Sequence, residues 1–127
     1  MKFRCECGHV IRDQTDSLPY KCDILPDDGT WDAFHWPIVL AMVDFAKSTA
    51  NGDREGWLSR HFGTEYPRDL DDKSVVSDLI SGYMSRLRPM YQCTECGSLF
   101  IQKTLGGEFV MFKPTDDDWQ DILTWRN

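Results

Sequence analysis

Hydrophobic and polar residues alternate near both ends of the chain, whereas apolar residues recur every three to four positions in its middle. A period of two is typical of half-buried strands, and the longer period is typical of helices. The strand candidates are the residues before Cys5, Val10-Ile11, 20–25, 98–104 and 108–113. Gly106-Gly107 separates the last two and predicts a hairpin turn. We therefore expect an antiparallel sheet made from the two ends of the chain.

The middle of the chain predicts about three helices. The first has Pro37 in its first turn, where proline is favoured, and ends at Asn51-Gly52. The boundaries of the second and third helices are Asp53 and Gly63, then Asp71 or Asp72 and Pro89. The expected apolar stripe of the third helix comprises Val76, Leu79, Ile80, Tyr83 and Leu87.

The chain has 127 residues, which is the size of one domain with a single core. We assign it to the α+β class. The expected parts are a zinc-ribbon-like antiparallel sheet (1–25 and 90–113), a helical insertion (31–88) and a C-terminal short helix or tail (114–127). Thr115 could cap that last helix, with the following aspartates near its positive end. Trp119 and Trp125 would then pack onto the body of the protein.

Four cysteines stand in two couplets, Cys5-Glu6-Cys7-Gly8 and Cys93-Thr94-Glu95-Cys96-Gly97. Each couplet is followed by a glycine and then by a strand-like run, which is the pattern of a zinc knuckle. The glycine relieves the backbone where the amides fold toward sulfur. Four thiolates satisfy a tetrahedral Zn²⁺ with bonds of about 2.3 Å. We predict a structural zinc site with the ligands Cys5, Cys7, Cys93 and Cys96; iron would use the same four thiolates.

The sequence allows three other interpretations of these residues. The cysteines could be reduced and unligated, or Cys93 and Cys96 could form a redox pair. The second couplet does not open a helix after a strand, however, as a thioredoxin-like motif would. His9 could replace one thiolate as a ligand, although four sulfurs already complete the shell. The fifth cysteine, Cys22, fits a small buried core thiol.

Charge and composition narrow the function classes. The content of hydrophobic residues, 41%, argues against a disordered chain. The formal net charge of −7 repels phosphate groups and therefore disfavours nucleic acid as a partner. An odd number of cysteines favours a reducing compartment. No signal peptide follows Met1, and the apolar run from Trp36 to Val43 is far shorter than the roughly 20 residues that span a bilayer. We expect a soluble cytoplasmic protein with a basic protein partner.

The favoured function is a protein-binding module, and its most specific form would be an immunity- or antitoxin-like inhibitor of a basic partner. Candidate partner-binding residues are Trp31, Asp116, Asp117, Asp118, Trp119 and Trp125, although the aspartates also fit solvated helix caps. A second hypothesis is a nucleic-acid-associated ribbon with a basic stripe of Lys2, Arg4, Arg12 and Lys21. A third is a hydrolase using His35 or His61, for which no orienting group can be named. An enzyme is the less favoured class.

Four stretches of the chain resemble a group of small uncharacterised bacterial proteins. These stretches are Phe3–Asp13, Leu18–Lys21, Tyr91–Phe100 and Phe112–Pro114. The proteins of this group carry a split zinc ribbon around a helical insert. The resemblance implies a fold and a metal but no settled activity. The similarity to immunity proteins is one of size and charge only.

Overall fold

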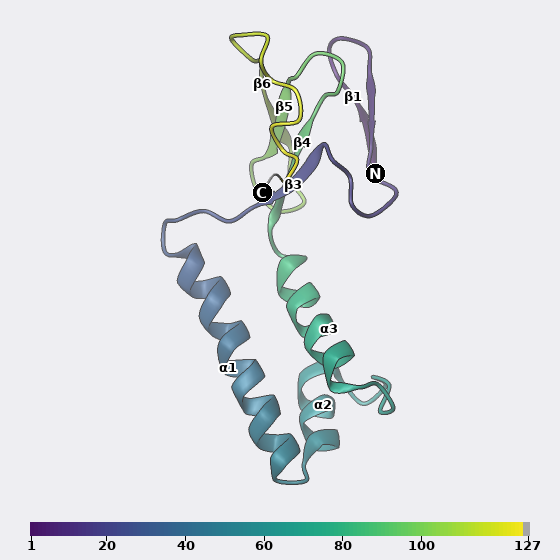
Figure 1. Ribbon diagram of the computed structural model, residues 1–127, viewed down its shortest axis with the longest axis vertical. Coiled ribbons are helices and arrows are strands. Elements are labelled where there is room, and N and C mark those ends of the chain that lie inside the picture. Colours follow the sequence, from purple (N-terminus) through teal and green to yellow (C-terminus); the bar gives the residue numbers. More distant parts are fainter. Residues whose placement is uncertain (126–127) are drawn as a thin grey trace. The chain divides into compact units, whose positions relative to one another are not determined.

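The computed structural model describes residues 1–125, and these divide into two compact units (Figure 1). The sheet unit consists of Met1–Leu25 together with the residues from Leu87 onward, and the helical unit consists of Pro26–Arg86. The helical unit is thus an insertion between two halves of the sheet unit. The three helices and two antiparallel sheets confirm the α+β class.

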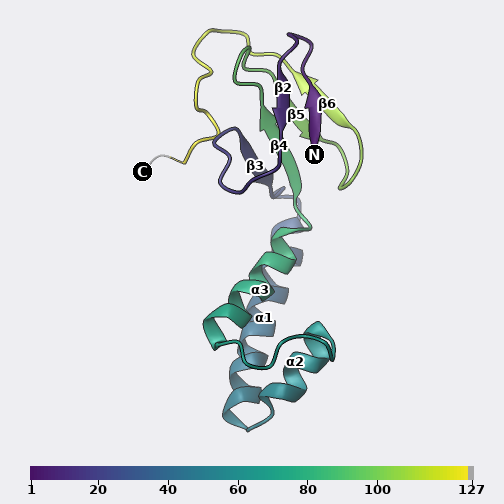
Figure 2. The same ribbon diagram turned by 90° about the vertical axis from the view of Figure 1, so that its right-hand side faces the viewer.

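The sheet unit contains a two-stranded hairpin and a four-stranded sheet, both antiparallel (Figures 1 and 2). The hairpin pairs β1 (Lys2–Arg4) with β2 (Val10–Arg12). The larger sheet has the order β3-β4-β5-β6, with β3 (Lys21–Ile24), β4 (Arg88–Gln92), β5 (Leu99–Gln102) and β6 (Phe109–Phe112). Gln102 is paired with Phe109, so β5 and β6 form the hairpin that the two glycines predict.

The inner face of the small hairpin packs against the larger sheet. Phe3 and Ile11 are cross-strand partners on this face, and Ile11 is buried. The Phe3 ring lies 5.5 Å from the Tyr91 ring and 5.1 Å from the Phe100 ring, both with edge-to-face geometry. Such aromatic pairs contribute about 0.5–1.5 kcal/mol beyond the area that they bury. The core of the sheet unit therefore joins the two sheets.

A half-buried carboxylate adds a polar link between the hairpin and the sheet. Asp13 Oδ2 accepts hydrogen bonds from Lys21 Nζ at 2.8 Å and from the Tyr91 hydroxyl. Burial alone would raise the pKa of Asp13, but the Lys21 and Tyr91 hydrogen bonds outweigh it and lower the pKa. Burial and the same carboxylate raise the pKa of Tyr91. Asp13 is therefore ionised and paired in the folded protein at neutral pH.

The helical unit is built from α1 (Thr30–Ala50), α2 (Arg54–Phe62) and α3 (Asp72–Met84). Helix α1 packs against α2 and against α3, and Figures 1 and 2 show α1 and α3 side by side. The buried residues of this unit are Phe45, Trp57, Leu58, Val75 and Leu79. They come from all three helices, so each helix needs the other two to bury its apolar face.

The starts of two helices follow the sequence prediction and the start of one does not. Asp71 caps α3, because its Oδ1 accepts the Ser74 N–H at 2.8 Å. Helix α2 begins after Asp53, as expected. Helix α1 begins at Thr30 rather than near Pro37, which lies inside it. An internal proline removes one helical hydrogen bond and is unfavourable, yet α1 continues through Pro37.

The apolar stripe of α3 differs in part from the prediction. Val75 and Leu79 are buried, whereas Ile80 is exposed and Leu87 lies beyond the end of the helix at Met84. Residues 114–125, expected as a short helix or a tail, form turns, and residues 126–127 lie outside the described part of the chain. Asp116 Oδ1 accepts the Asp118 N–H at 3.2 Å, a local bond that competes with helix formation.

Cys22 lies in β3 and is half-buried rather than fully buried. None of the described helices combines the length and the apolar character needed to cross a lipid bilayer.

Candidate metal centre

Two turns of related geometry carry the four cysteines. In the first turn, between β1 and β2, the Cys5 N–H donates to the His9 carbonyl at 2.8 Å and the Gly8 N–H donates to the Cys5 carbonyl at 2.9 Å. In the second turn, between β4 and β5, the Cys93 N–H donates to the Ser98 carbonyl at 2.8 Å and the Gly97 N–H donates to the Cys93 carbonyl at 2.9 Å. The second turn is one residue longer, which accommodates the longer spacing of its cysteines.

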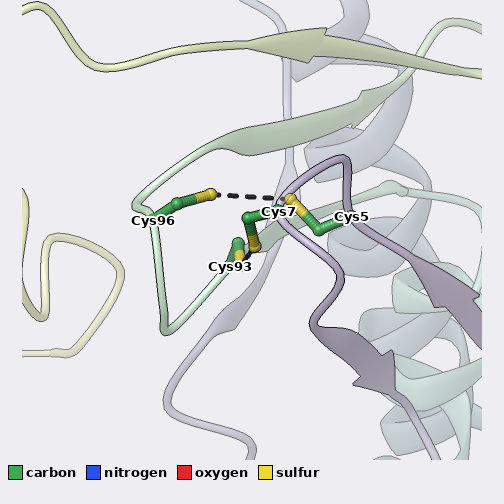
Figure 3. Close-up of side chains that lie close together, drawn as sticks. All are labelled: Cys5, Cys7, Cys93 and Cys96. Atoms are coloured by element: carbon green, nitrogen blue, oxygen red, sulfur yellow. Dashed lines mark hydrogen bonds between the residues drawn. The ribbon is translucent and has the colours of Figure 1, made fainter.

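The four sulfur atoms converge. Figure 3 shows the side chains of Cys5 and Cys7 pointing toward those of Cys93 and Cys96. All four Sγ atoms lie within 4.8 Å of one another, and the Cys5–Cys96 and Cys7–Cys93 sulfurs are 3.5 and 3.6 Å apart. A regular tetrahedron with metal–sulfur bonds of about 2.3 Å has sulfur–sulfur distances of about 3.8 Å. The cluster is therefore compatible with a four-thiolate metal ion such as zinc.

The cluster is buried on one side and open on the other. Cys5 and Cys93 belong to the core of the sheet unit, whereas Cys7 is exposed and Cys96 is half-buried. A cavity of about 420 Å³ opens beside the cluster, and Glu6 and Lys113 contribute to its lining. The two buried cysteines tie the cluster to the hydrophobic core.

The surroundings of the four thiols are not equivalent. Burial raises the pKa of Cys5, and it raises the pKa of Cys93 to about 12. Burial acts in the same direction on Cys96, but hydrogen bonds with the Ser98 hydroxyl and backbone lower its pKa to about 6. Metal binding requires all four sulfurs to be deprotonated, so it would release protons.

Polar contacts hold the two turns together around the sulfurs. His9 Nε2 lies 3.3 Å from Thr94 Oγ1, and His9 Nδ1 lies 4.0 Å from Glu95 Oε1. Lys113 Nζ, which follows β6, lies 2.8 Å from Glu6 Oε2. His9 thus bridges to the opposite turn, and it is not part of the sulfur cluster.

The ring of Trp119 supports the second turn. A Cβ atom on Gly97 would lie 2.3 Å from Trp119 Cδ2, and Gly97 has a φ of +73°. Gln92 Nε2 donates to the Trp119 carbonyl at 2.6 Å, which holds the tryptophan beside the turn. Gly97 is therefore required both for its backbone conformation and for this close approach. The sequence marks the glycine, but no local pattern connects it with a tryptophan 22 positions later.

Comparison with known proteins gives one result at the level of the family. The model of a family described as "Domain of unknown function (DUF8617)" matches residues 1–118. The chain belongs to this family. The match includes all four clustered cysteines and the entire helical unit of this DUF8617 protein. Searches among curated proteins and among solved structures gave no match.

The histidines considered for hydrolysis lie in the helical unit of the DUF8617 protein. The His35 ring stacks on Trp31 with centroids 5.0 Å apart, and the His61 ring stacks on Trp57 at 4.7 Å. Among the described residues, neither imidazole forms a hydrogen bond with a carboxylate. Aromatic rings stack on both imidazoles, and burial together with the Arg86 charge lowers the pKa of His61, against the opposing effect of Asp44.

The remaining candidate residues are dispersed. Trp31 lies at the start of α1 and is exposed, whereas Trp119 is half-buried in the sheet unit. Trp125 and the three aspartates 116–118 are exposed on the C-terminal segment. Among the candidate metal-ligating and partner-binding residues, the four cysteines form one cluster.

Proposed function

We propose that this protein is a non-catalytic, zinc-stabilised protein-binding module of the cytoplasm. The observation that carries the proposal is the convergence of Cys5, Cys7, Cys93 and Cys96, whose sulfurs lie within 4.8 Å of one another. Their free state fits a reducing compartment, because such a compartment keeps thiols available to metal.

Zinc is the metal that this donor set favours. Four thiolates in a near-tetrahedral arrangement are typical of structural zinc sites, and iron is the principal competitor for the same ligands. Four protein ligands fill the coordination shell and leave no position for a catalytic water. The metal would then act as a structural link.

The link has a large effect because of where its ligands stand in the sequence. Cys7 and Cys93 are 86 residues apart, and Cys5 and Cys96 are 91 apart. Joining positions so distant removes much conformational freedom from the unfolded chain. The link also fixes the small hairpin, whose two strands have only three residues each.

Protein binding is the role that the surface supports best. The chain carries a net charge of −7, and exposed aspartates 116–118 follow one another on the C-terminal segment. Exposed tryptophans such as Trp31 and Trp125 provide aromatic anchors of the kind that dominate interfaces. The partner would be basic, and an immunity- or antitoxin-like inhibitor is the most specific form of this proposal.

Metal analysis tests the zinc part. Protein purified without added metal should contain one zinc per chain, and Cys93→Ser should abolish this zinc. Cys22→Ser is the matched control, because Cys22 lies outside the cluster, and it should retain the metal. A metal-free wild type that does not take up added zinc would exclude the site, and stoichiometric iron would reassign it.

Charge variants test the partner part. The triple variant Asp116→Asn/Asp117→Asn/Asp118→Asn should lose a basic protein that the wild type retains from host lysate. The control Asp16→Asn/Asp27→Asn/Asp69→Asn removes the same charge from exposed positions elsewhere and should retain that protein. Equal retention by both variants would refute binding through the C-terminal aspartates.

One observation favours a second candidate, nucleic-acid binding through the small hairpin. Lys2 is the cross-strand partner of Arg12, so both side chains point away from the core, and Arg4 shares this exposed face. Lys21, by contrast, pairs with Asp13. Phosphate binding by this face must weaken steeply with salt and must fall on Arg4→Gln. Salt-independent or absent binding would exclude it.

A further inference from the structure

Helix α1 exposes an apolar face on the side opposite its buried stripe. Trp36, Leu40 and Val43 follow one another at helical spacing and are 53%, 65% and 46% exposed. Phe45, on the opposite side, is buried in the core of the helical unit. A helix that is apolar on both sides is typically covered on both. The exposed face lies outside the metal centre and does not depend on it.

Part of the outward face of α1 is symmetric about the point between Val39 and Leu40. Three pairs of exposed residues at equal distances from that point have similar size and polarity or opposite charge. The outward-facing pairs are Asp32 with Lys47, Ala33 with Ala46, and Trp36 with Val43. When two identical helices pack antiparallel about a two-fold axis through this point, each residue meets its mirror mate in the other copy. The apolar face is therefore complementary to itself.

The charges at the two ends of the face select the antiparallel direction. Asp32 and Lys47 form no ion pair within the described chain. An antiparallel pair of helices would place each Asp32 opposite Lys47 of the second copy, twice per dimer. A parallel pair would instead set Asp32 beside Asp32 and Lys47 beside Lys47, which is repulsive.

We propose that two copies of this chain associate through α1 in an antiparallel, two-fold dimer centred between Val39 and Leu40. Trp36 of each copy packs against Val43 of the other, while Ala33 and Ala46 allow close approach at the ends. A single pair of helices buries less area than the roughly 1,200 Å² of a standard interface, so the dissociation constant falls in the micromolar range. This proposal goes beyond the proposed function and stands without it.

Sedimentation equilibrium of the full-length protein over a concentration series tests the dimer. The wild type should approach twice the 14.8 kDa chain mass at high concentration. Leu40→Glu places a charge at the centre of the interface and should raise the dissociation constant at least about 100-fold. The matched control is Leu105→Glu, since Leu105 is 55% exposed in the sheet unit and the charge change is the same. It should dimerise as the wild type does.

Charge reversal tests the direction of the helices. Asp32→Lys and Lys47→Asp should each weaken the dimer about 10-fold, because each creates two repulsive contacts. The double variant Asp32→Lys/Lys47→Asp should restore the wild-type constant within about twofold by the same pairing rule. A parallel dimer would be nearly indifferent to either single reversal.

Each possible result decides the proposal. A monomeric wild type overturns it. This outcome includes the case in which another part of the chain, or a different protein, covers the α1 face. A dimer that survives Leu40→Glu also overturns it. Loss of rescue by the double reversal overturns the antiparallel arrangement. Circular dichroism checks that Leu40→Glu is folded; if it is not, Val43→Glu and the reversal set give the answer.

Discussion

The sheet unit and the helical unit have cores of similar size but hold them together by different means. Each core contains five buried residues. Two of the five in the sheet unit, Cys5 and Cys93, are also candidate metal ligands. The helical unit contains no cysteine, and its core rests on aromatic and aliphatic packing.

This difference shows two alternative ways in which a small unit can be stabilised. Short strands and a core of a few side chains contribute little free energy on their own, and a structural metal is one common supplement. The helical unit instead stacks rings, with Phe45 and Trp57 centroids 4.7 Å apart and Phe62 and Tyr66 centroids 4.2 Å apart. Only the sheet unit should therefore depend on metal.

Removal of the metal should give the largest effect and should separate the two units. Structural zinc contributes about 10–16 kcal/mol of apparent binding free energy in small domains. A strong chelator should therefore unfold the sheet unit while the helical unit keeps its structure. Amide exchange followed by NMR would show loss of protection in β4 and β5 with retained protection in α1 and α3. Equal loss in both units would contradict the separation.

Truncation of the helical core should give the opposite pattern. Leu58 is fully buried, so Leu58→Ala should lower the free energy of unfolding of the helical unit by about 2–5 kcal/mol. Zinc content should be unchanged. Urea denaturation combined with metal analysis measures both quantities. The control Leu105→Ala alters an exposed leucine and should stay within about 0.5 kcal/mol of the wild type.

A glycine substitution in the second cysteine turn should have a smaller effect on stability than metal removal or truncation of the helical core. Gly97→Ala forces a positive φ on alanine and directs its Cβ into the Trp119 ring, which should cost about 2–3 kcal/mol and weaken zinc retention. Gly82→Ala is the control, because Gly82 lies inside α3 with open space around its Cβ position. It should stabilise the helical unit by up to about 1 kcal/mol. Thermal melts and competition with a chelator distinguish the two outcomes.

Loss of the Asp13 carboxylate should have the smallest effect, and this effect depends on pH. The pKa of Asp13 is lowered in the folded state, so its contribution is complete above about pH 4 and is lost as the pH falls through the folded pKa. Asp13→Asn should cost about 1–2 kcal/mol at pH 7. The difference from the wild type should shrink on acidification. A difference that stays constant down to pH 2 would contradict this assignment.

The cysteine cluster was accessible to sequence reasoning because the spacing of cysteines within each turn is a local feature. Cysteine spacing and the following glycines identify Cys5, Cys7, Cys93 and Cys96 without knowledge of the fold. The α+β class was accessible for a similar reason, since strand and helix periodicities differ. The Asp71 cap likewise depends on residues three positions apart.

The features that sequence reasoning missed depend on contacts or on competing local bonds. The packing of Trp119 on Gly97 joins distant positions and has no signature in either neighbourhood. The predicted start of α1 was too late because Pro37, a residue type favoured in the first turn of a helix, was assigned to that turn. In the structure Pro37 lies inside the helix. The C-terminal segment was expected to be a short helix or a tail, and residues 114–125 form turns in which the Asp116 side chain accepts the Asp118 N–H.

The insertion of the helical unit between the two cysteine turns sets the order of events during synthesis. A ribosome that adds about 5–20 residues per second needs about 4–17 s to make the stretch between Cys7 and Cys93. The entire sequence of the helical unit is translated within that interval. Cys5 and Cys7 are therefore synthesised several seconds before Cys93 and Cys96, and during this interval the other two sulfurs of the cluster do not yet exist.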